Sequence, residues 1–107
     1  MPRAGLSPEV LAAAAATIAD VDGVDALRLS TVAERFGVAV PSLYKHVDGL
    51  DDLRRRVAVL AARELADALR EAATGRAEGD ALRGMAGAYR HYASGHPGRY
   101  ALLQRAP

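Results

Sequence analysis

Apolar side chains recur every three or four residues along most of this chain, the spacing that places them on one face of an α-helix. The first such segment follows Ser7-Pro8-Glu9. Serine is a favoured helix cap, proline suits the first turn, and an acid there complements the helix dipole. The run Asp20-Val21-Asp22-Gly23 ends this helix. Residues 24–29, whose apolar positions are broken by polar ones, predict a packed loop.

The remaining apolar segments predict five more helices with clear breaks between them. The first of these is stopped by Gly37, and the next is opened by Pro41. We expect Asp80 to cap the fifth helix, after a loop over residues 75–79. The predicted ranges are 30–36, 42–47, 50–73, 81–94 and 98–104. No segment alternates with a period of two, so the predicted fold class is all-α.

Composition narrows the classes of protein that this all-α chain can represent. Of the 107 residues, 24 are alanine and 5% are aromatic, so the helices must pack through small aliphatic side chains. The absence of cysteine excludes disulfide scaffolds, thiolate zinc sites and cysteine nucleophiles. A formal net charge of +1 excludes a protein that coats nucleic acid by bulk charge, but it leaves room for a local basic surface.

Residues 29–47 have the spacing of a helix-turn-helix. Ala33 lies four residues before Gly37, and Leu43 lies six residues after it. A small side chain at position 33 lets the second helix cross close to the first, and glycine at 37 permits the left-handed turn. Apolar residues around them would hold the two helices at a fixed angle. A plain helical hairpin without a role in DNA binding is the alternative.

The exposed side of the second helix of this pair favours the DNA-binding alternative. Ser42, Tyr44, Lys45 and His46 all carry hydrogen-bond donors, and none is acidic. Between residues 28 and 47 three basic side chains face one acid, a local net charge of +2. Positive charge is therefore concentrated where DNA phosphates would lie.

The same residues carry a resemblance to the TetR family of bacterial transcriptional repressors. The stretch from 37 to 47, GVAVPSLYKHV, is similar to the family motif G-V-x-x-x-S/T-L-Y-x-H-V/F. The segment from Tyr89 to Leu103 is similar to the opening of the regulatory domain in a TetR subgroup. The resemblance implies a helix-turn-helix DNA-binding domain over residues 1–49. Residues 50–107 would hold the linking fourth helix and the beginning of a truncated ligand-binding and dimerisation domain.

The resemblance also implies roles for individual residues in binding DNA. Four of them match positions that meet base edges or nearby sugars: Val40, Pro41, Ser42 and Lys45. Four others match positions that contact phosphates: Ser30, Thr31, Tyr44 and His46. For His46, a structural hydrogen bond to the start of the fourth helix is an equal alternative. Tyr44 and Lys45 have the alternative of being merely exposed.

Three positions depart from the TetR pattern. Ala39 stands where the family often has a capping serine, and Leu50 stands where it often has a phosphate-binding lysine. Arg54 or Arg55 could replace that lysine, although the run from 54 to 56 is also typical of a solvated helix face. Val40 and Pro41 cannot make bidentate contacts with bases, so contact there would be apolar, for example with a thymine methyl group.

The fifth predicted helix carries a second candidate site. Met85, Tyr89 and Tyr92 share one helix face with Leu82. They would form either the wall of a small-molecule inducer pocket or plain core. His91 and His96 do not have the spacing of metal ligands on one helix, so we predict no metal site. No motif for catalysis or cofactor binding is present, which predicts a protein that is not an enzyme.

Together these features predict a sequence-specific DNA-binding regulator, most simply a ligand-responsive repressor. The expected partners are a near-palindromic DNA operator, a small-molecule inducer and a second copy of the full-length protein. No segment predicts a membrane span, so a cytoplasmic location is expected. A helical protein-interaction module, or a helical small-molecule binder without DNA binding, remains the alternative.

Overall fold

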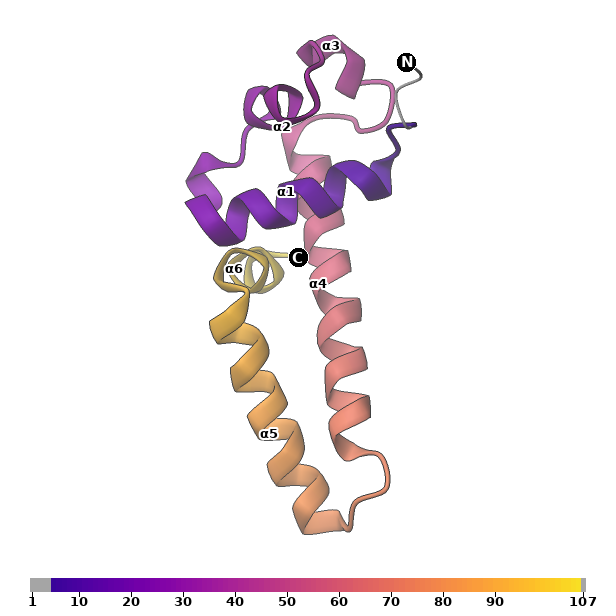
Figure 1. The fold of residues 1–107 in the computed structure, drawn as a ribbon, viewed down its shortest axis with the longest axis vertical. Coiled ribbons are helices and arrows are strands. Elements are labelled where there is room, and N and C mark those ends of the chain that lie inside the picture. Colours follow the sequence, from indigo (N-terminus) through magenta and orange to yellow (C-terminus); the bar gives the residue numbers. More distant parts are fainter. Residues whose placement is uncertain (1–4, 107) are drawn as a thin grey trace.

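The computed structural model describes residues 5–106, and these fold entirely into helices and the turns between them (Figure 1). Residues 1–4 and 107, which belong to the two predicted domains, lie outside the described range. The described chain measures 51 × 28 × 23 Å. Its elements are α1 (Pro8–Asp22), the 3-10 turn η1 (Val24–Ala26), α2 (Leu29–Phe36), α3 (Val40–Leu43), α4 (Leu50–Ala73), α5 (Glu78–Gly95) and α6 (Pro97–Arg105). The all-α prediction is confirmed.

The first helix forms as its sequence pattern predicts. The backbone N–H of Val10 donates to Ser7 Oγ at 3.1 Å, which satisfies one of the free amides of the first turn. Gly23 ends α1 with a φ of 93°, a conformation that other residues rarely adopt. The predicted loop that follows contains one 3-10 turn, η1, and Leu27 directly after it is fully buried in the core.

The main core lies where α1, α2 and α3 meet the first half of α4. Its fully buried side chains include Leu11, Leu27, Leu43 and Leu53. Leu102 of α6 joins the same core from the far end of the sequence. We call residues 5–49, with α1, α2 and α3, the head. The head therefore shares its core with the segment from 50 to 106.

A helical hairpin of α4 and α5 extends away from the head, as Figure 1 shows. A smaller cluster of Ala61, Leu65 and Tyr92 holds its two helices together. The prediction that Asp80 caps α5 is wrong. The helix begins at Glu78, three residues before the predicted start at residue 81. Asp80 lies inside the helix and forms an ion pair with Arg83 at 2.7 Å.

The third helix is shorter and earlier than the predicted range of 42–47. It covers only Val40–Leu43 and continues into turns. Backbone bonds here join residues three apart: Ser42 N to Ala39 O at 3.0 Å, and His46 N to Leu43 O at 2.9 Å. No side chain caps this helix, and after Leu43 the chain continues in turns, in which Val47 N also donates to Leu43 O at 3.0 Å.

Two further features of the described residues bear on the class of protein. No helix between residues 5 and 106 is long and apolar enough to cross a membrane. Within the same range no three histidine or acidic side chains gather closely enough to hold a metal ion.

Candidate nucleic-acid interface

The turn between α2 and α3 has the geometry that the sequence spacing predicts. Gly37 adopts the left-handed conformation, with φ 66° and ψ 32°, and its N–H donates to Glu34 O at 3.1 Å. Val38 N donates to Ala33 O at 3.0 Å, which closes the end of α2. No atom lies within 4 Å of the place a Cβ would take on Gly37. The positive φ, and not lack of space, is what requires glycine there.

Buried side chains lock α2 against α3. Val32 and Leu43 are fully buried, and Ala33 is nearly so. The small side chain of Ala33 lets the two helices approach, as its spacing indicated. The structure therefore fixes one helix against the other and leaves their remaining faces open.

All eight residues predicted to contact DNA lie on α2, α3 or the turn after α3, and none is buried. Tyr44 is 55% exposed. The exposed residues of the set are Ser30, Pro41, Tyr44 and Lys45, and the half-buried ones are Thr31, Val40, Ser42 and His46. Figure 1 places α2 and α3 at the end of the molecule opposite to the tip of the hairpin. The arrangement can present donors and short apolar side chains to a groove of DNA.

Asp52, rather than His46, fastens the start of α4. Among the described residues the His46 imidazole makes no hydrogen bond to α4, whereas Asp48 N donates to Asp52 Oδ2 at 2.9 Å. This hydrogen bond holds the pKa of the Asp52 carboxyl below its usual value, despite the opposing effect of partial burial, and Arg56 lowers it further. Nothing in the sequence analysis singled out Asp52 for this contact. An acidic residue at the third position of a helix, whose side chain can accept from a backbone N–H before the helix, is the sequence pattern that indicates this role.

Arginines of α4 that could replace the missing phosphate-binding lysine form ion pairs with aspartates of the same helix. Arg54 pairs with Asp51 at 3.4 Å, Arg55 pairs with Asp52 at 3.5 Å, and Arg56 pairs with Asp52 at 3.2 Å. Exposed pairs of this kind are weak, about 0–1 kcal/mol, but the two aspartates offset most of the positive charge of the three arginines. This pairing favours the interpretation of residues 54–56 as a solvated helix face.

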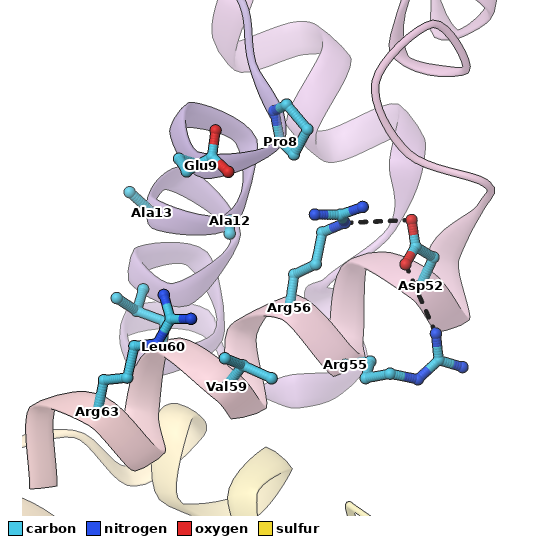
Figure 2. A pocket seen from close by; sticks show the side chains of 10 residues that line it. All are labelled: Pro8, Glu9, Ala12, Ala13, Asp52, Arg55, Arg56, Val59, Leu60 and Arg63. Atoms are coloured by element: carbon cyan, nitrogen blue, oxygen red, sulfur yellow. Dashed lines mark hydrogen bonds and ion pairs between the residues drawn. The ribbon is translucent and has the colours of Figure 1, made fainter. Parts of the chain in front are cut away.

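A groove of about 400 Å³ lies between α1 and α4 on the flank of the head (Figure 2). Ala12, Ala13 and Leu60 contribute apolar surface, and the Asp52 carboxylate stands with Arg55 and Arg56 at its edge. Nothing in the sequence pattern singled out this groove, because its two walls come from helices far apart in the chain.

The structure brings together two of the three residues of the candidate inducer pocket. Met85 and Tyr89 line a shallow, open groove of about 450 Å³ along α4 and α5, together with Leu69 and Leu82. Tyr92 points elsewhere. It is 6% exposed, and its O–H donates to Glu64 Oε1 at 2.7 Å. The core interpretation therefore fits Tyr92, whereas Met85 and Tyr89 stay at the surface.

Comparisons with known proteins add to this geometry. No family model matches the chain. It is 44% identical over 104 residues to a Mycobacterium tuberculosis protein called "Uncharacterized HTH-type transcriptional regulator Rv0681", covering 97% of this chain and 48% of that protein. It is 37% identical over 105 residues to a Bacillus subtilis protein called "Uncharacterized HTH-type transcriptional regulator YobS", covering 96% of this chain and 55% of that protein. The chain thus spans about half the length of the curated relatives it matches.

A solved structure shares the arrangement of the helices. The crystal structure named "putative regulatory protein SCO4313" superposes with a TM-score of 0.72 at 35% identity, over 94% of this chain and 48% of that one. The similarity extends through the head and the hairpin. The fold described above is therefore also that of part of a larger regulatory protein.

Proposed function

We propose that this chain is the DNA-reading part of a transcriptional regulator of the TetR type. The observation that carries the proposal is the locked α2–α3 pair, with eight unburied side chains of the matching types on its open faces. The similarity to two proteins named HTH-type transcriptional regulators supports it. A role in binding, rather than in catalysis, follows from the same features.

Contacts with DNA would divide between phosphates and base edges. Ser30 and Thr31 lie in the first turn of α2, where free backbone amides attract phosphate oxygens, and Tyr44 and His46 can donate to the backbone on the other side of the groove. Lys45 can donate to guanine. The phosphate contacts would fix the position of the protein on the DNA, while Ser42 and the apolar pair Val40 and Pro41 would complete the contact with base edges.

We further propose that the full-length protein is a cytoplasmic homodimer that binds a near-palindromic operator and represses transcription. Two copies of the α2–α3 pair would enter successive major grooves. A small-molecule inducer would bind in the regulatory part, with Met85 and Tyr89 in its wall, and release the DNA. The open groove at these residues supports a place for such a ligand.

Paired substitutions test the DNA-binding proposal. Tyr44→Ala with Lys45→Ala should lower affinity at least tenfold for DNA selected from a random-sequence library. The slope of affinity against salt should also fall by about 0.9 for each phosphate that the variant no longer neutralises. Titration by fluorescence anisotropy at several salt concentrations measures both effects.

A matched control removes the same kinds of side chain from α5, away from α2 and α3. Tyr89→Ala with Arg90→Ala also deletes one exposed tyrosine and one positive charge, and it should leave DNA affinity unchanged. Equal losses in the two double variants would contradict the assignment of α3. A native chain that is not retained on heparin or on random DNA at low salt would favour a helical interaction module or a small-molecule binder instead.

A further inference from the structure

The start of α6 lacks a cap of its own. His96 precedes the helix with φ −132° and ψ 63°, and its side chain caps no backbone amide. The first amides of a helix have no partner within the helix, and a buried one left unsatisfied is costly. The missing acceptor comes from Asp20, in the last turns of α1, 79 residues earlier in the chain.

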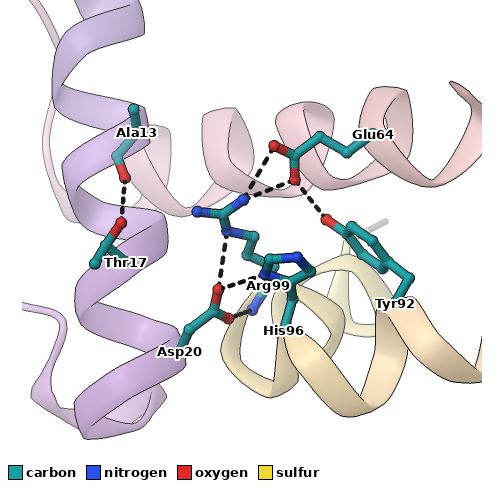
Figure 3. Close-up of polar contacts among 7 residues, drawn as sticks. All are labelled: Ala13, Thr17, Asp20, Glu64, Tyr92, His96 and Arg99. Carbon is teal, nitrogen blue, oxygen red and sulfur yellow. Dashed lines mark hydrogen bonds and ion pairs between the residues drawn. The ribbon is translucent and has the colours of Figure 1, made fainter. Parts of the chain in front are cut away.

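Asp20 makes three contacts with the beginning of α6 (Figure 3). Its Oδ1 accepts from the backbone N–H of Arg99 at 2.8 Å, as the side chain of a capping residue would. Its Oδ2 lies 3.1 Å from His96 Nδ1 and 3.0 Å from Arg99 Nε. The contact with Nε is an ion pair that lacks hydrogen-bond geometry. The Asp20 side chain is only 11% exposed.

Arg99 also contacts the hairpin, through Glu64. Its Nη1 lies 2.9 and 3.0 Å from the two carboxylate oxygens of Glu64 on α4. Tyr92 on α5 donates to the same carboxylate. Burial, followed by the hydrogen bond to Glu64, raises the pKa of Tyr92 above its ordinary value. One chain of polar contacts thus joins α1, α6, α4 and α5.

Gly98 shows how closely α6 approaches α1. A Cβ on Gly98 would collide with both the carbonyl carbon and the carbonyl oxygen of Ala19. Backbone lies directly against backbone there, one residue before Asp20. The charged contacts of Asp20 and Arg99 are directional, and they add to this close packing in fixing the register of α6 on α1.

From this geometry we infer that Asp20 and Arg99 are positioning residues that hold the head and α6 as one rigid body, so that the placement of α6 sets the placement of the DNA-reading pair. The effect on DNA binding rests on the proposed function. The rigid body formed by the head and α6 does not depend on it. Neither residue lies on α2 or α3, so both act through the orientation of the head.

Three measurements on the whole chain test the inference. The chain has no cysteine, so a spin-label pair can be attached through Glu34→Cys on α2 and Arg90→Cys on α5, both exposed. The first measurement is the width of the distance distribution between the labels. The second is amide hydrogen exchange at Arg99, and the third is affinity for the selected operator DNA in the protein without labels.

Asp20→Ala should broaden the distance distribution and speed exchange of the Arg99 amide at least tenfold, while amides inside α2 stay protected. DNA affinity should fall about fivefold, because a loose head must be ordered on binding. Asp20→Asn keeps an acceptor for the Arg99 amide and loses the charge, so it should restore slow exchange but not the full affinity. Asp67→Ala is the control, since it removes an exposed ion pair of 2.7 Å with Arg70.

Arg99→Lys is the milder variant if Asp20→Ala does not fold. It keeps the charge and the backbone N–H but cannot bridge two carboxylates, and it should also broaden the distribution. A distribution as narrow as that of the unaltered chain in both variants would overturn the role of Asp20 and Arg99 in holding the head and α6 together. A broadened distribution with unchanged DNA affinity would overturn the effect on DNA. An unaltered chain that binds no DNA would instead refute the proposed function and leave the rigid body standing on the label distances.

Discussion

Two glycines show how differently single residues are constrained in this protein. Gly37 has open space around its Cα and a φ of 66°, so conformation alone requires glycine. Gly98 is not among the positive-φ residues, yet a side chain there would collide with the backbone of Ala19. The first constraint belongs to a local turn and can be recognised from a motif. The second exists only because α6 meets α1.

Gly98→Ala should therefore destabilise the protein even though alanine is the better helix former. Forcing a methyl group into a filled space typically costs about 1–3 kcal/mol, more than the gain of about 0.5–1 kcal/mol from replacing glycine inside a helix. Urea unfolding measures the difference. Gly87→Ala in α5 is the matched control, because nothing lies within 4 Å of its Cβ position, and it should stabilise. A similar gain in both variants would mean that α6 does not lie against Ala19.

At the scale of the elements, the ends of the helices depend on partners that are not always local. Ser7 caps α1 from the adjacent position, as expected. Neither Ala39 before α3 nor Ala77 before α5 offers a side-chain cap, and α6 is capped by a different helix. The start of α4 depends on Asp52, whose carboxylate accepts from Asp48 N. This last contact fixes the turn between α3 and α4, directly after the residues proposed to contact DNA.

The contribution of Asp52 to stability should depend on pH in a defined direction. Its pKa is lowered in the folded protein from the ordinary value of 3.8, chiefly by the hydrogen bond from Asp48 N. The stabilisation is therefore fully present above the ordinary pKa and is lost as the pH falls through the folded value. Asp52→Asn should lower the free energy of unfolding at neutral pH, and its difference from the unaltered chain should shrink below pH 3.8.

Urea midpoints at a series of pH values measure this difference. Asp67→Asn, which alters an exposed carboxylate on the same helix, serves as the control and should show little change at any pH. A difference for Asp52→Asn that stays constant down to strongly acid pH would refute the role of the carboxylate charge.

At the scale of the whole molecule, the head and the hairpin share structure instead of meeting at a linker. The 24 residues of α4 begin in the core of the head and end at the far tip of the hairpin. Leu102 of α6 lies in the core that Leu11 and Val57 also form. The residues proposed to contact DNA are at one end of this 51 Å body, and the groove at Met85 and Tyr89 lies along the hairpin.

Leu102→Ala should consequently weaken the head, although the substitution lies in the last helix. Truncating a buried leucine typically costs about 2–5 kcal/mol, a large part of the stability of a small domain. Amide hydrogen exchange should show faster exchange in α1 and α2 as well as in α6. Leu82→Ala, at a side chain 70% exposed, is the control and should leave exchange in the head unchanged. Loss of protection confined to α6 would show that the head folds independently.

The sequence by itself determined the helices, the α2–α3 turn and the residues on its open face. These features depend on contacts within a few residues, which periodicity, caps and a glycine at 37 encode directly. It placed Asp80 wrongly as a cap and extended the third helix too far, because neither pattern revealed that both helices begin without a side-chain cap.

Only the tertiary structure decided that α6 lies on α1 and that Asp20 caps α6. It also decided that Tyr92 points inward to Glu64, while Met85 and Tyr89 remain at the surface. The sequence around residues 20 and 99 does not indicate that they pair, because aspartate and arginine are both common on solvent-exposed helix faces. Their partnership arises when the chain folds back after α5 and leaves the side chains of Arg99 and Asp20 only 15% and 11% exposed, so that each compensates the charge of the other.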